Sequence, residues 1–291
     1  MKRFTGSLVS QPVLRLFLKE GFSGEVRGSG STAAYIEVAG LIIAITGRTV
    51  PPMPNGISVV QQHGLQAFQT GAPVEIGPKA ITSAGASVSL VQPRVWDPRP
   101  PQWENAAEAL LAAGRELWWR LRLARTDDPV DMVDRLARAG YETASEQHGR
   151  AGLEALFTSL AEADAETARR AAGLLIGRGP GLTPEGDDFL AAALATFYAC
   201  EPSTPWRRGH LSAWRSAVLP VDLSERTTLL SSTLLHFAEW GWVPEPVQTL
   251  LDLEASSDVW LDALRRLKKV GHGTGRAWAA GCAAALILLT R

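Results

Sequence analysis

The sequence changes character at a proline-rich stretch, Pro93-Arg94-Val95-Trp96-Asp97-Pro98-Arg99-Pro100-Pro101. Four prolines in nine residues are too many for a helix or a central strand, because proline has a fixed φ and no backbone N–H. The stretch therefore predicts a linker. It divides the 291 residues into two domains, residues 1–98 and residues 99–291.

The residues before the linker predict a β-rich domain. Between Gly24 and Pro93 the sequence is rich in Gly, Pro, Ser, Val and Ile. Short β-branched runs at residues 34–38 and 41–45 are bounded by Gly40 and Gly47, which is typical of strands. We expect further strands at residues 57–60, 74–76 and 86–91. Short strands separated by turn residues indicate a small barrel or sandwich.

The residues after the linker predict a helical domain. From residue 104 onward Ala, Leu, Glu and Arg dominate, and apolar residues recur at helical spacing. We expect helices at residues 104–125, 129–140, 153–176, 187–198, 224–240, 246–253, 259–270 and 276–289. The predicted fold is therefore α+β: a small β-barrel or sandwich followed by a mainly α-helical C-terminal domain.

Composition and charge exclude several classes of protein. Hydrophobic residues make up 46% of the chain and charged residues 20%, as in a folded globular protein rather than a disordered one. Lys and Arg number 29 against 30 Asp and Glu, a formal net charge of -1. Such a chain has no long-range attraction for nucleic acid or for an anionic membrane, so we expect neither as a partner. Any anion must be bound locally.

The cysteines and the apolar runs bear on the cellular compartment. Cys200 and Cys282 are the two cysteines, and each lies in an Ala-rich run, so they predict neither a disulfide framework nor a zinc site. The longest apolar run, residues 277–289, is shorter than the about 20 residues of a membrane-spanning helix. Polar residues soon interrupt the N-terminal stretch, unlike a secretory signal. We expect a cytoplasmic protein.

The most unusual segment is Gly181-Leu182-Thr183-Pro184-Glu185-Gly186-Asp187-Asp188. One interpretation is structural: Thr183 is the N-cap and Pro184 the first residue of a helix. Capping does not explain Gly186 in the first turn, where glycine costs about 1 kcal/mol relative to alanine. It does not explain the glycines at 177, 179 and 181 either. Close approach of the backbone to a ligand would explain both.

A glycine-rich backbone at a helix N-terminus can bind phosphate or carboxylate without bulk basic charge. The candidate ligand-binding residues here are Arg178, Gly179, Gly181, Thr183 and Gly186. Asp187 and Asp188 are candidate catalytic residues. Two carboxylates repel an anion unless a metal, an amide or an ammonium group lies between, so the segment suits a ligand of both polarities.

A second corner, Val270-Gly271-His272-Gly273-Thr274-Gly275, repeats the alternating glycines of residues 176–181. In a structural interpretation Gly271 caps one helix and Thr274 the next. In a functional one, His272 is a third catalytic residue that transfers a proton near neutral pH. Gly273, Thr274 and Arg276 then bind an anion. The residues leave both interpretations open.

Two weaker candidates lie outside the glycine corners. Thr228 and Ser231, near a helix start, either satisfy backbone carbonyls or line a polar pocket. Asn55, in the turn Pro54-Asn55-Gly56, either supplies a positive backbone angle between strands or contacts a ligand. No Walker A lysine, Rossmann strand, histidine pair or nucleophile-elbow serine accompanies these motifs, which argues against standard ATP, NAD and serine-hydrolase sites.

The segment at residues 181–188 resembles the G-L-T-P-x-G-D-D signature of a bacterial family catalogued as a domain of unknown function. That family includes a subunit of the oxamate carbamoyltransferase of allantoin catabolism. The resemblance extends more loosely to the Asn55 turn, residues 226–231 and the second corner. Where the family commonly has G-H-T-S-G followed by an aspartate, this chain has Thr274 in place of serine and Ala277 near the position of the acid.

The resemblance implies an enzyme subunit similar to a carbamoyltransferase of nitrogen or purine-derived ureide catabolism. It would bind a small anion such as carbamoyl phosphate or oxamate, and other enzyme subunits. The amides of Gly179 and Gly181, with Arg178, would hold the phosphate. Asp187 or Asp188 would bind the NH₂ group.

In this interpretation His272 would assist proton transfer, and no redox cofactor is required. Two alternatives remain. A hydrolase or phosphotransferase would need Mg²⁺ as a cofactor, bound by the two aspartates. A non-catalytic subunit would only bind a ligand or assemble with other chains.

Overall fold

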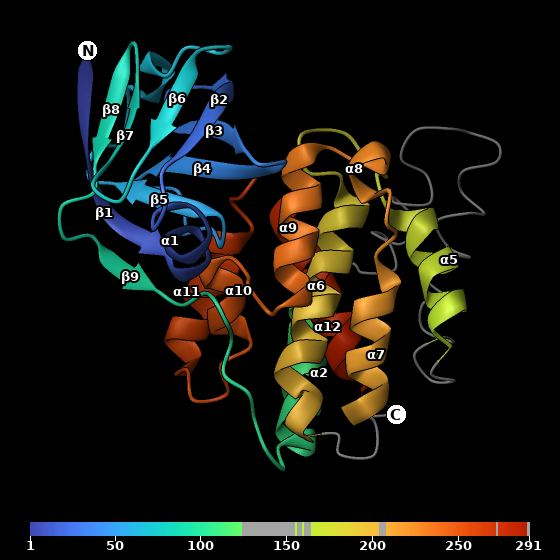
Figure 1. The fold of residues 1–291 in the computed structure, drawn as a ribbon. Coiled ribbons are helices and arrows are strands. Elements are labelled where there is room, and N and C mark those ends of the chain that lie inside the picture. Colours follow the sequence, from blue (N-terminus) through green and yellow to red (C-terminus); the bar gives the residue numbers. More distant parts are fainter. Residues whose placement is uncertain (124–154, 156–158, 160–163, 204–207, 272, 290–291) are drawn as a thin grey trace. The chain divides into compact units, whose positions relative to one another are not determined.

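The computed structural model describes residues 1–123, 155, 159, 164–203, 208–271 and 273–289. Contacts between Cα atoms divide the chain into two compact units, Met1–Pro98 and Arg99–Arg291 (Figure 1). The boundary lies in the proline-rich stretch. The helix expected at residues 129–140 lies outside the described residues. So do residues 153–154, 156–158 and 160–163 of the helix expected at residues 153–176, whose later part is described.

The first unit is a closed barrel, so the predicted α+β fold is confirmed. Its strands are β1 (Lys2–Ser10), β2 (Phe22–Ser29), β3 (Ala33–Val38), β4 (Leu41–Gly47), β5 (Gly56–Val59), β6 (Pro73–Ile76), β7 (Ala80–Ser83), β8 (Ala86–Ser89) and β9 (Arg94–Trp96). The first eight close in the order β1-β5-β4-β3-β2-β6-β7-β8, because β1 pairs with β5 as well as with β8. Strand β9 pairs in parallel with the end of β1.

Alternation of side chains fills the barrel. In β3, Ala34, Ile36 and Val38 are buried while the residues between them are half-buried, as the period of two in a strand requires. Helix α1 (Gln11–Phe17) follows β1 directly, and Ser10 caps it through a bond from the Val13 N–H to Oγ of 3.4 Å. A single turn of 3₁₀ helix, η1 (Leu65–Ala67), adds Leu65 to the same core.

Two details of the barrel differ from expectation. The proline-rich stretch is not a linker throughout, because residues 94–96 form β9 at the edge of the sheet, where proline neighbours are tolerated. The turn before β5 has no positive φ at Asn55 or Gly56. Asn55 is instead fully buried and donates from Nδ2 to the Ile42 carbonyl at 3.0 Å. Gly56 is required for space, since a Cβ there would lie 2.8 Å from the Met53 carbonyl oxygen.

The second unit is helical. Its helices are α2 (Ala107–Leu123), α5 (Ala165–Leu175), α6 (Glu185–Cys200), α7 (Arg208–Val218), α8 (Leu223–Arg226), α9 (Leu229–Glu239), α10 (Glu245–Leu250), α11 (Ser257–Leu267) and α12 (Thr274–Leu288), with a 3₁₀ turn η2 (Glu201–Ser203). Helix α6 is buried on every side, and it packs against α9 and α12 at the centre of the unit (Figure 1). Within the described residues, no helix combines the length and the apolar character needed to cross a bilayer.

The helix expected at residues 224–240 is broken in two. Helix α8 ends at Arg226, and α9 begins at Leu229. Thr227 between them is extended, with φ -143° and ψ -179°, and Thr228 is the N-cap of α9. Apolar residues keep their helical spacing across residues 224–240, so the sequence gives no sign of the break between α8 and α9. Its cause is a contact with a residue far away in the sequence, described below.

Both cysteines are free and fully buried. Burial raises the pKa of the Cys200 thiol, and it raises the pKa of the Cys282 thiol to about 12. Because the thiolate is the reactive form, we expect neither cysteine to react with a disulfide reagent such as DTNB at pH 8 in the native protein. Both should react after unfolding in guanidinium chloride. Release of one equivalent of chromophore from native protein within minutes would contradict this expectation.

Candidate functional site

The starts of three helices meet in the second unit. The hydroxyls of Thr183, just before α6, and Thr274, the first residue of α12, lie 2.8 Å apart and share a hydrogen bond. The hydroxyl of Thr227, just before α9, donates to the carboxylate of Asp187 in the first turn of α6. The N-termini of α6, α9 and α12 are therefore held together by side chains.

The three helices also run in the same direction (Figure 1). Gly281 of α12 lies against the Phe189 carbonyl of α6, and Gly241, after the end of α9, lies against Tyr198 near the end of α6. Parallel helices add their dipoles, and each N-terminus carries about half a positive charge. The helix dipoles therefore add positive potential at the meeting point, where the first turn of α6 also carries the carboxyl groups of Glu185, Asp187 and Asp188.

Most of the first corner's glycines are accounted for by the fold. Gly177 and Gly179 have φ of 75° and 114°, and a Cβ would lie 2.3 Å from the Arg226 carbonyl oxygen or 2.8 Å from the Glu185 nitrogen. Gly186 has no room either, since its Cβ would lie 2.1 Å from the Leu175 carbonyl oxygen. Gly181 differs: its φ is 99°, but a Cβ would meet open space. Close packing of the chain on itself therefore explains three of the four without a ligand.

The predicted N-caps are wrong by one residue. Pro184, not Thr183, is the N-cap of α6, and Gly273, not Thr274, is the N-cap of α12. Neither of these residues caps through a side chain. The two threonine hydroxyls are used instead for the bond between the corners.

Asp187 ties the loops together. Its side chain is buried, Oδ1 accepts from the Gly177 N–H at 2.8 Å, and Oδ2 accepts from the Thr227 hydroxyl. Burial raises the pKa of the Asp187 carboxyl group, and these two hydrogen bonds oppose the rise. Thr227 is drawn toward Asp187 in an extended conformation, which is the physical cause of the break between α8 and α9. Ser231 Oγ is buried nearby and has no hydrogen-bond partner of good geometry among the described residues.

The two carboxyl oxygens of Asp188 have different surroundings. The residue is 2% exposed, and Oδ1 accepts from the Trp278 indole N–H at 3.1 Å. Oδ2 is buried and has no hydrogen-bond partner of good geometry in the part of the chain that the structure describes. Burial, and then the neighbouring charge of Asp187, raise the pKa of the Asp188 carboxyl group well above its usual range. The hydroxyls of Thr183 and Thr274 are near enough to lower it partly.

Comparison with known protein families identifies the part of the chain that contains these helix starts. Residues 175–286 match the family model of oxamate carbamoyltransferase subunit AllH. The resemblance predicted from the sequence is therefore confirmed over residues 175–286, while its looser extension to the Asn55 turn stays a prediction. No curated protein and no solved structure matches the chain.

We call residues 175–286 the AllH segment. It begins at the last residue of α5 and ends inside α12, so it contains both glycine corners and the starts of α6, α9 and α12. The structure brings several of the candidate residues together within it: Thr183, Asp187, Asp188, Thr228, Ser231, Gly273 and Thr274.

Two arginines of the AllH segment were expected to bind an anion. Arg178 donates from Nε to the Leu174 carbonyl at 3.2 Å, and its role toward a ligand stays a prediction. Arg276 lies half-buried in the first turn of α12. Thr228 caps α9, because its Oγ1 accepts from the Ser231 N–H at 3.1 Å.

Two further candidates are Asn55 and His272. Asn55 belongs to the first unit, outside the AllH segment. His272 lies outside the described residues. Trp278 was missed from the sequence, although it lies four residues after Thr274 and so on the same face of a helix.

The side chains around Asp187 and Asp188 show whether a metal ion could bind there. Within the described ranges, no group of three or more His, Cys, Asp or Glu side chains could hold one. Both oxygens of Asp187 are already engaged by donors, so it would have to give up the Gly177 or the Thr227 bond to bind Mg²⁺. The geometry therefore does not favour the two aspartates as a metal site.

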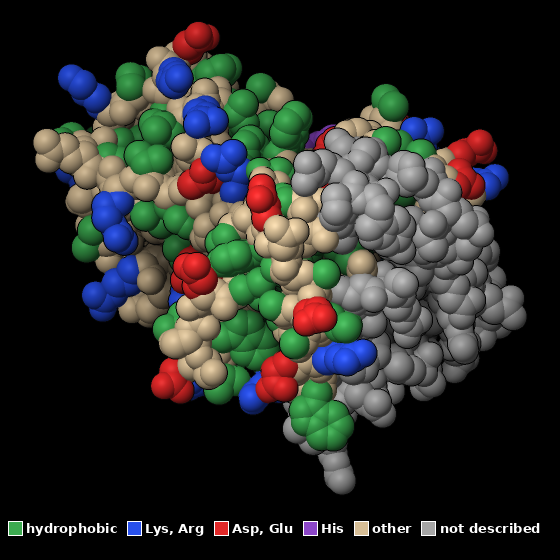
Figure 2. Space-filling model, turned by 90° about the horizontal axis from the view of Figure 1, so that it is seen from below, with side chains coloured by type: hydrophobic (Ala, Val, Ile, Leu, Met, Phe, Trp, Pro, Cys, Tyr) green, Lys and Arg blue, Asp and Glu red, His purple; other side chains and the backbone are tan. Residues whose placement is uncertain are grey.

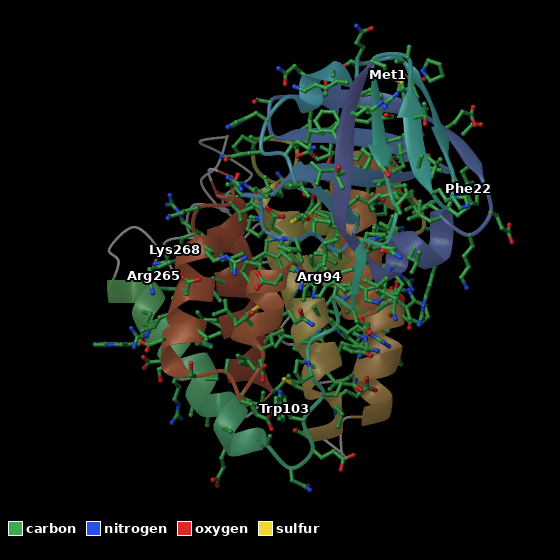
Figure 3. The ribbon with its side chains drawn as sticks, turned by 90° about the vertical axis from the view of Figure 1, so that its left-hand side faces the viewer. Met1, Phe22, Arg94, Trp103, Arg265 and Lys268 are labelled. Carbon is green, nitrogen blue, oxygen red and sulfur yellow. The ribbon has the colours of Figure 1, made fainter. Side chains whose placement is uncertain are left out.

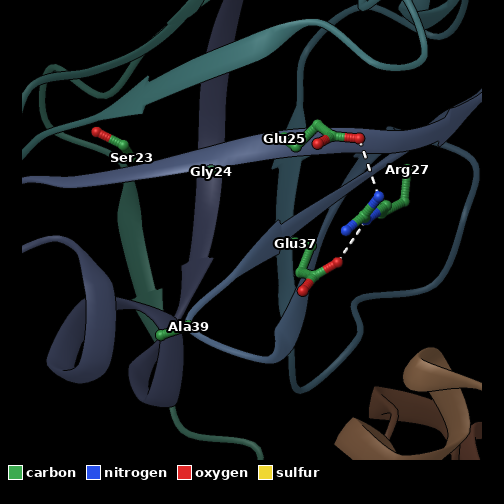
Figure 4. Close-up of a pocket in the computed structure, with 6 residues that line it drawn as sticks. All are labelled: Ser23, Gly24, Glu25, Arg27, Glu37 and Ala39. Carbon is green, nitrogen blue, oxygen red and sulfur yellow. Dashed lines mark hydrogen bonds and ion pairs between the residues drawn. The ribbon is translucent and has the colours of Figure 1, made fainter.

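Described residues form two surface hollows, and neither is lined by a residue of the glycine corners. On the barrel, a hollow is lined by Ser23, Gly24, Glu25, Arg27, Glu37 and Ala39, and Arg27 pairs there with both glutamates (Figure 4). Another lies between α2 and α11, lined by Arg120, Leu261, Leu264, Arg265 and Lys268 (Figure 3). On the face shown in Figure 2, basic and acidic side chains of the described residues are interspersed, which fits the balanced charge.

Proposed function

We propose that the chain is a cytoplasmic subunit of a carbamoyltransferase similar to oxamate carbamoyltransferase, and that it binds a small anionic metabolite where α6, α9 and α12 begin. One observation carries the proposal: Oδ2 of Asp188 is buried near the Thr183–Thr274 pair and has no hydrogen bond of good geometry among the described residues. Buried polar atoms without a partner are rare in native proteins. Such an atom, next to two hydroxyls at converging helix N-termini, supports a polar ligand-binding site at this place.

The ligands that suit this place are small and negatively charged. Carbamoyl phosphate and oxamate both carry an anionic group and an amide. In the transfer, the amide nitrogen of oxamate attacks the carbamoyl carbon, phosphate leaves with the bonding electrons, and the proton lost by the nitrogen is taken up by the departing phosphate. The protein's part is to position the two reactants and to stabilise the departing charge.

The description of the AllH family as a subunit supports a role for other chains. We infer that this chain works in a complex with other enzyme subunits. It is then either the catalytic chain or a binding subunit that catalyses nothing by itself. Turnover of carbamoyl phosphate and oxamate by the purified chain would establish the first. Turnover that requires added subunits, with unchanged oxamate binding by this chain, would establish the second.

Isothermal titration of the full chain with oxamate, carbamoyl phosphate and inorganic phosphate tests the site. We expect at least one to bind. In the Asp188→Leu variant the affinity should fall about 10- to 100-fold, because the Thr183–Thr274 pair loses the polar side chain beside it. The matched control is Asp258→Leu, at an exposed position in the first turn of α11, which should bind like the wild type. Absence of binding by the wild type to all three compounds would overturn the proposal.

A further inference from the structure

We propose that Asp188 is a positioning residue that acts as a neutral acid, and that it thereby directs the hydroxyls of Thr183 and Thr274 outward as donors to an anionic oxygen of the ligand. The inference rests on the proposed function, because it concerns the same site. It goes further by naming what the site recognises. The Asp188 end of the site selects a carboxylate or phosphate oxygen and not an amide N–H.

The position of the acid's proton follows from Trp278. The indole N–H can only donate, and it donates to Oδ1 at 3.1 Å. Oδ1 must therefore remain an acceptor. The proton of a neutral Asp188 lies on Oδ2, which is the oxygen without a partner of good geometry among the described residues.

The surroundings favour this neutral form. Asp188 is 2% exposed and adjoins Asp187, whose two oxygens are both held by donors that stabilise its negative charge. Two neighbouring buried carboxyl groups do not both ionise easily, and the one with fewer donors keeps the proton. In agreement, the pKa of Asp188 is raised well above its usual range, by burial and then by Asp187.

Other charged groups lie on the elements around this end of α6. Those in the described residues are Glu185 on α6, Arg178 in the preceding loop, Glu225 and Arg226 on α8, His236 and Glu239 toward the far end of α9, Lys268 and Lys269 before the second corner, and Arg276 on α12. Asp187 is the charge that shifts the Asp188 pKa. Arg226 is paired with Asp222 at 2.8 Å.

The two hydroxyls have two protons between them. At 2.8 Å one proton bridges Thr183 and Thr274, and the other must point inward or outward. An ionised Asp188 would attract the second proton inward, which would leave only lone pairs facing outward. A neutral Asp188 donates from Oδ2 to the pair, so the second proton faces outward. Both threonines are half-buried, so a ligand can reach them.

The Asp188→Asn variant tests the direction of this chain of donors. Its amide oxygen can accept from Trp278, and its NH₂ group can donate toward the threonines, as the neutral acid does. The probe is oxamate, whose carboxylate stays ionised from pH 5.5 to pH 8.5. Wild-type affinity should weaken as the pH rises, by about tenfold per pH unit above the Asp188 pKa in the free protein. The asparagine variant should lose this dependence and bind more tightly than the wild type at pH 8.5.

A second readout is proton uptake. Titrations in two buffers of different ionisation enthalpy should show that wild-type protein takes up a proton when it binds oxamate in the pH range where its affinity falls, and that Asp188→Asn does not. Oxamide, which has the amides without the carboxylate, should not compete with oxamate. Wild-type binding of oxamate that is lost in Asp188→Asn, or binding of oxamide as tight as oxamate, would overturn the inference and leave the proposed function intact. A wild type that binds no probe refutes the proposed function first.

The threonines are tested separately. Thr183→Val and Thr274→Val keep the shape of the side chain and remove the hydroxyl, and each should weaken oxamate binding about tenfold or more. Thr183→Ser and Thr274→Ser should restore most of the affinity. Thr249→Val is the control, since that hydroxyl bonds only within α10, to the Glu245 carbonyl at 3.1 Å. Valine variants that bind like the wild type would overturn the inference.

Discussion

Replacing Asp187 with alanine is expected to lower the free energy of unfolding of the helical unit by about 3 kcal/mol. The carboxylate accepts from the Gly177 N–H at 2.8 Å and from the Thr227 hydroxyl. Alanine leaves both donors without an acceptor in a buried place, and each such loss costs about 1–3 kcal/mol. Urea denaturation followed by circular dichroism measures the change. The midpoint of thermal unfolding should fall by about 6–12 °C.

Two further variants make this result specific. Asp187→Asn retains one acceptor oxygen but places an NH₂ group against the other donor, so its stability should lie between wild type and Asp187→Ala. Asp222→Ala removes the exposed i,i+4 partner of Arg226 and should cost less than about 0.5 kcal/mol. An Asp187→Ala protein as stable as the wild type that no longer binds oxamate would mean that Asp187 contacts the ligand and does not hold the loops.

Local patterns in the sequence were sufficient where neighbouring residues decide the structure. The β-branched runs at residues 34–38 and 41–45 predicted β3 and β4, because alternation needs no information from the rest of the chain. Strand β2 was missed. Gly24 weakens its pattern, yet that glycine is needed because a Cβ would lie 2.4 Å from the Glu37 carbonyl oxygen of β3. Only the paired strand reveals that reason.

For the candidate site, too, the sequence could predict some features and not others. The acids and glycines at residues 177–188 could be recognised as unusual because no helix start requires them. Their separate tasks could not be inferred, since they depend on contacts across the fold. Asp187 meets Thr227, 40 residues later, and Asp188 meets Trp278, 90 residues later. The break between α8 and α9 was missed for the same reason.

The other large effect is expected from Gly281→Ala, which should destabilise the helical unit by about 3 kcal/mol. In α12 a Cβ at this position would lie 2.3 Å from the Phe189 carbonyl oxygen and 2.7 Å from the Ala192 Cβ. The first of these atoms is backbone of the fully buried helix α6, so the two helices must move apart. The clash outweighs the about 1 kcal/mol that alanine gains over glycine in a helix interior. Chemical denaturation measures the difference.

The matched control is Gly173→Ala, in α5. A Cβ there would lie 3.4 Å from the end of the flexible Arg226 side chain, so helix propensity should prevail and stabilise the protein by about 0.5–1 kcal/mol. The two glycine variants also test whether the packing of α6 against α12 affects oxamate binding. Separation of α6 from α12 pulls Thr183 away from Thr274, so Gly281→Ala should bind oxamate more weakly and Gly173→Ala should not. Equal gains in stability for both variants would show that α6 and α12 do not pack this closely.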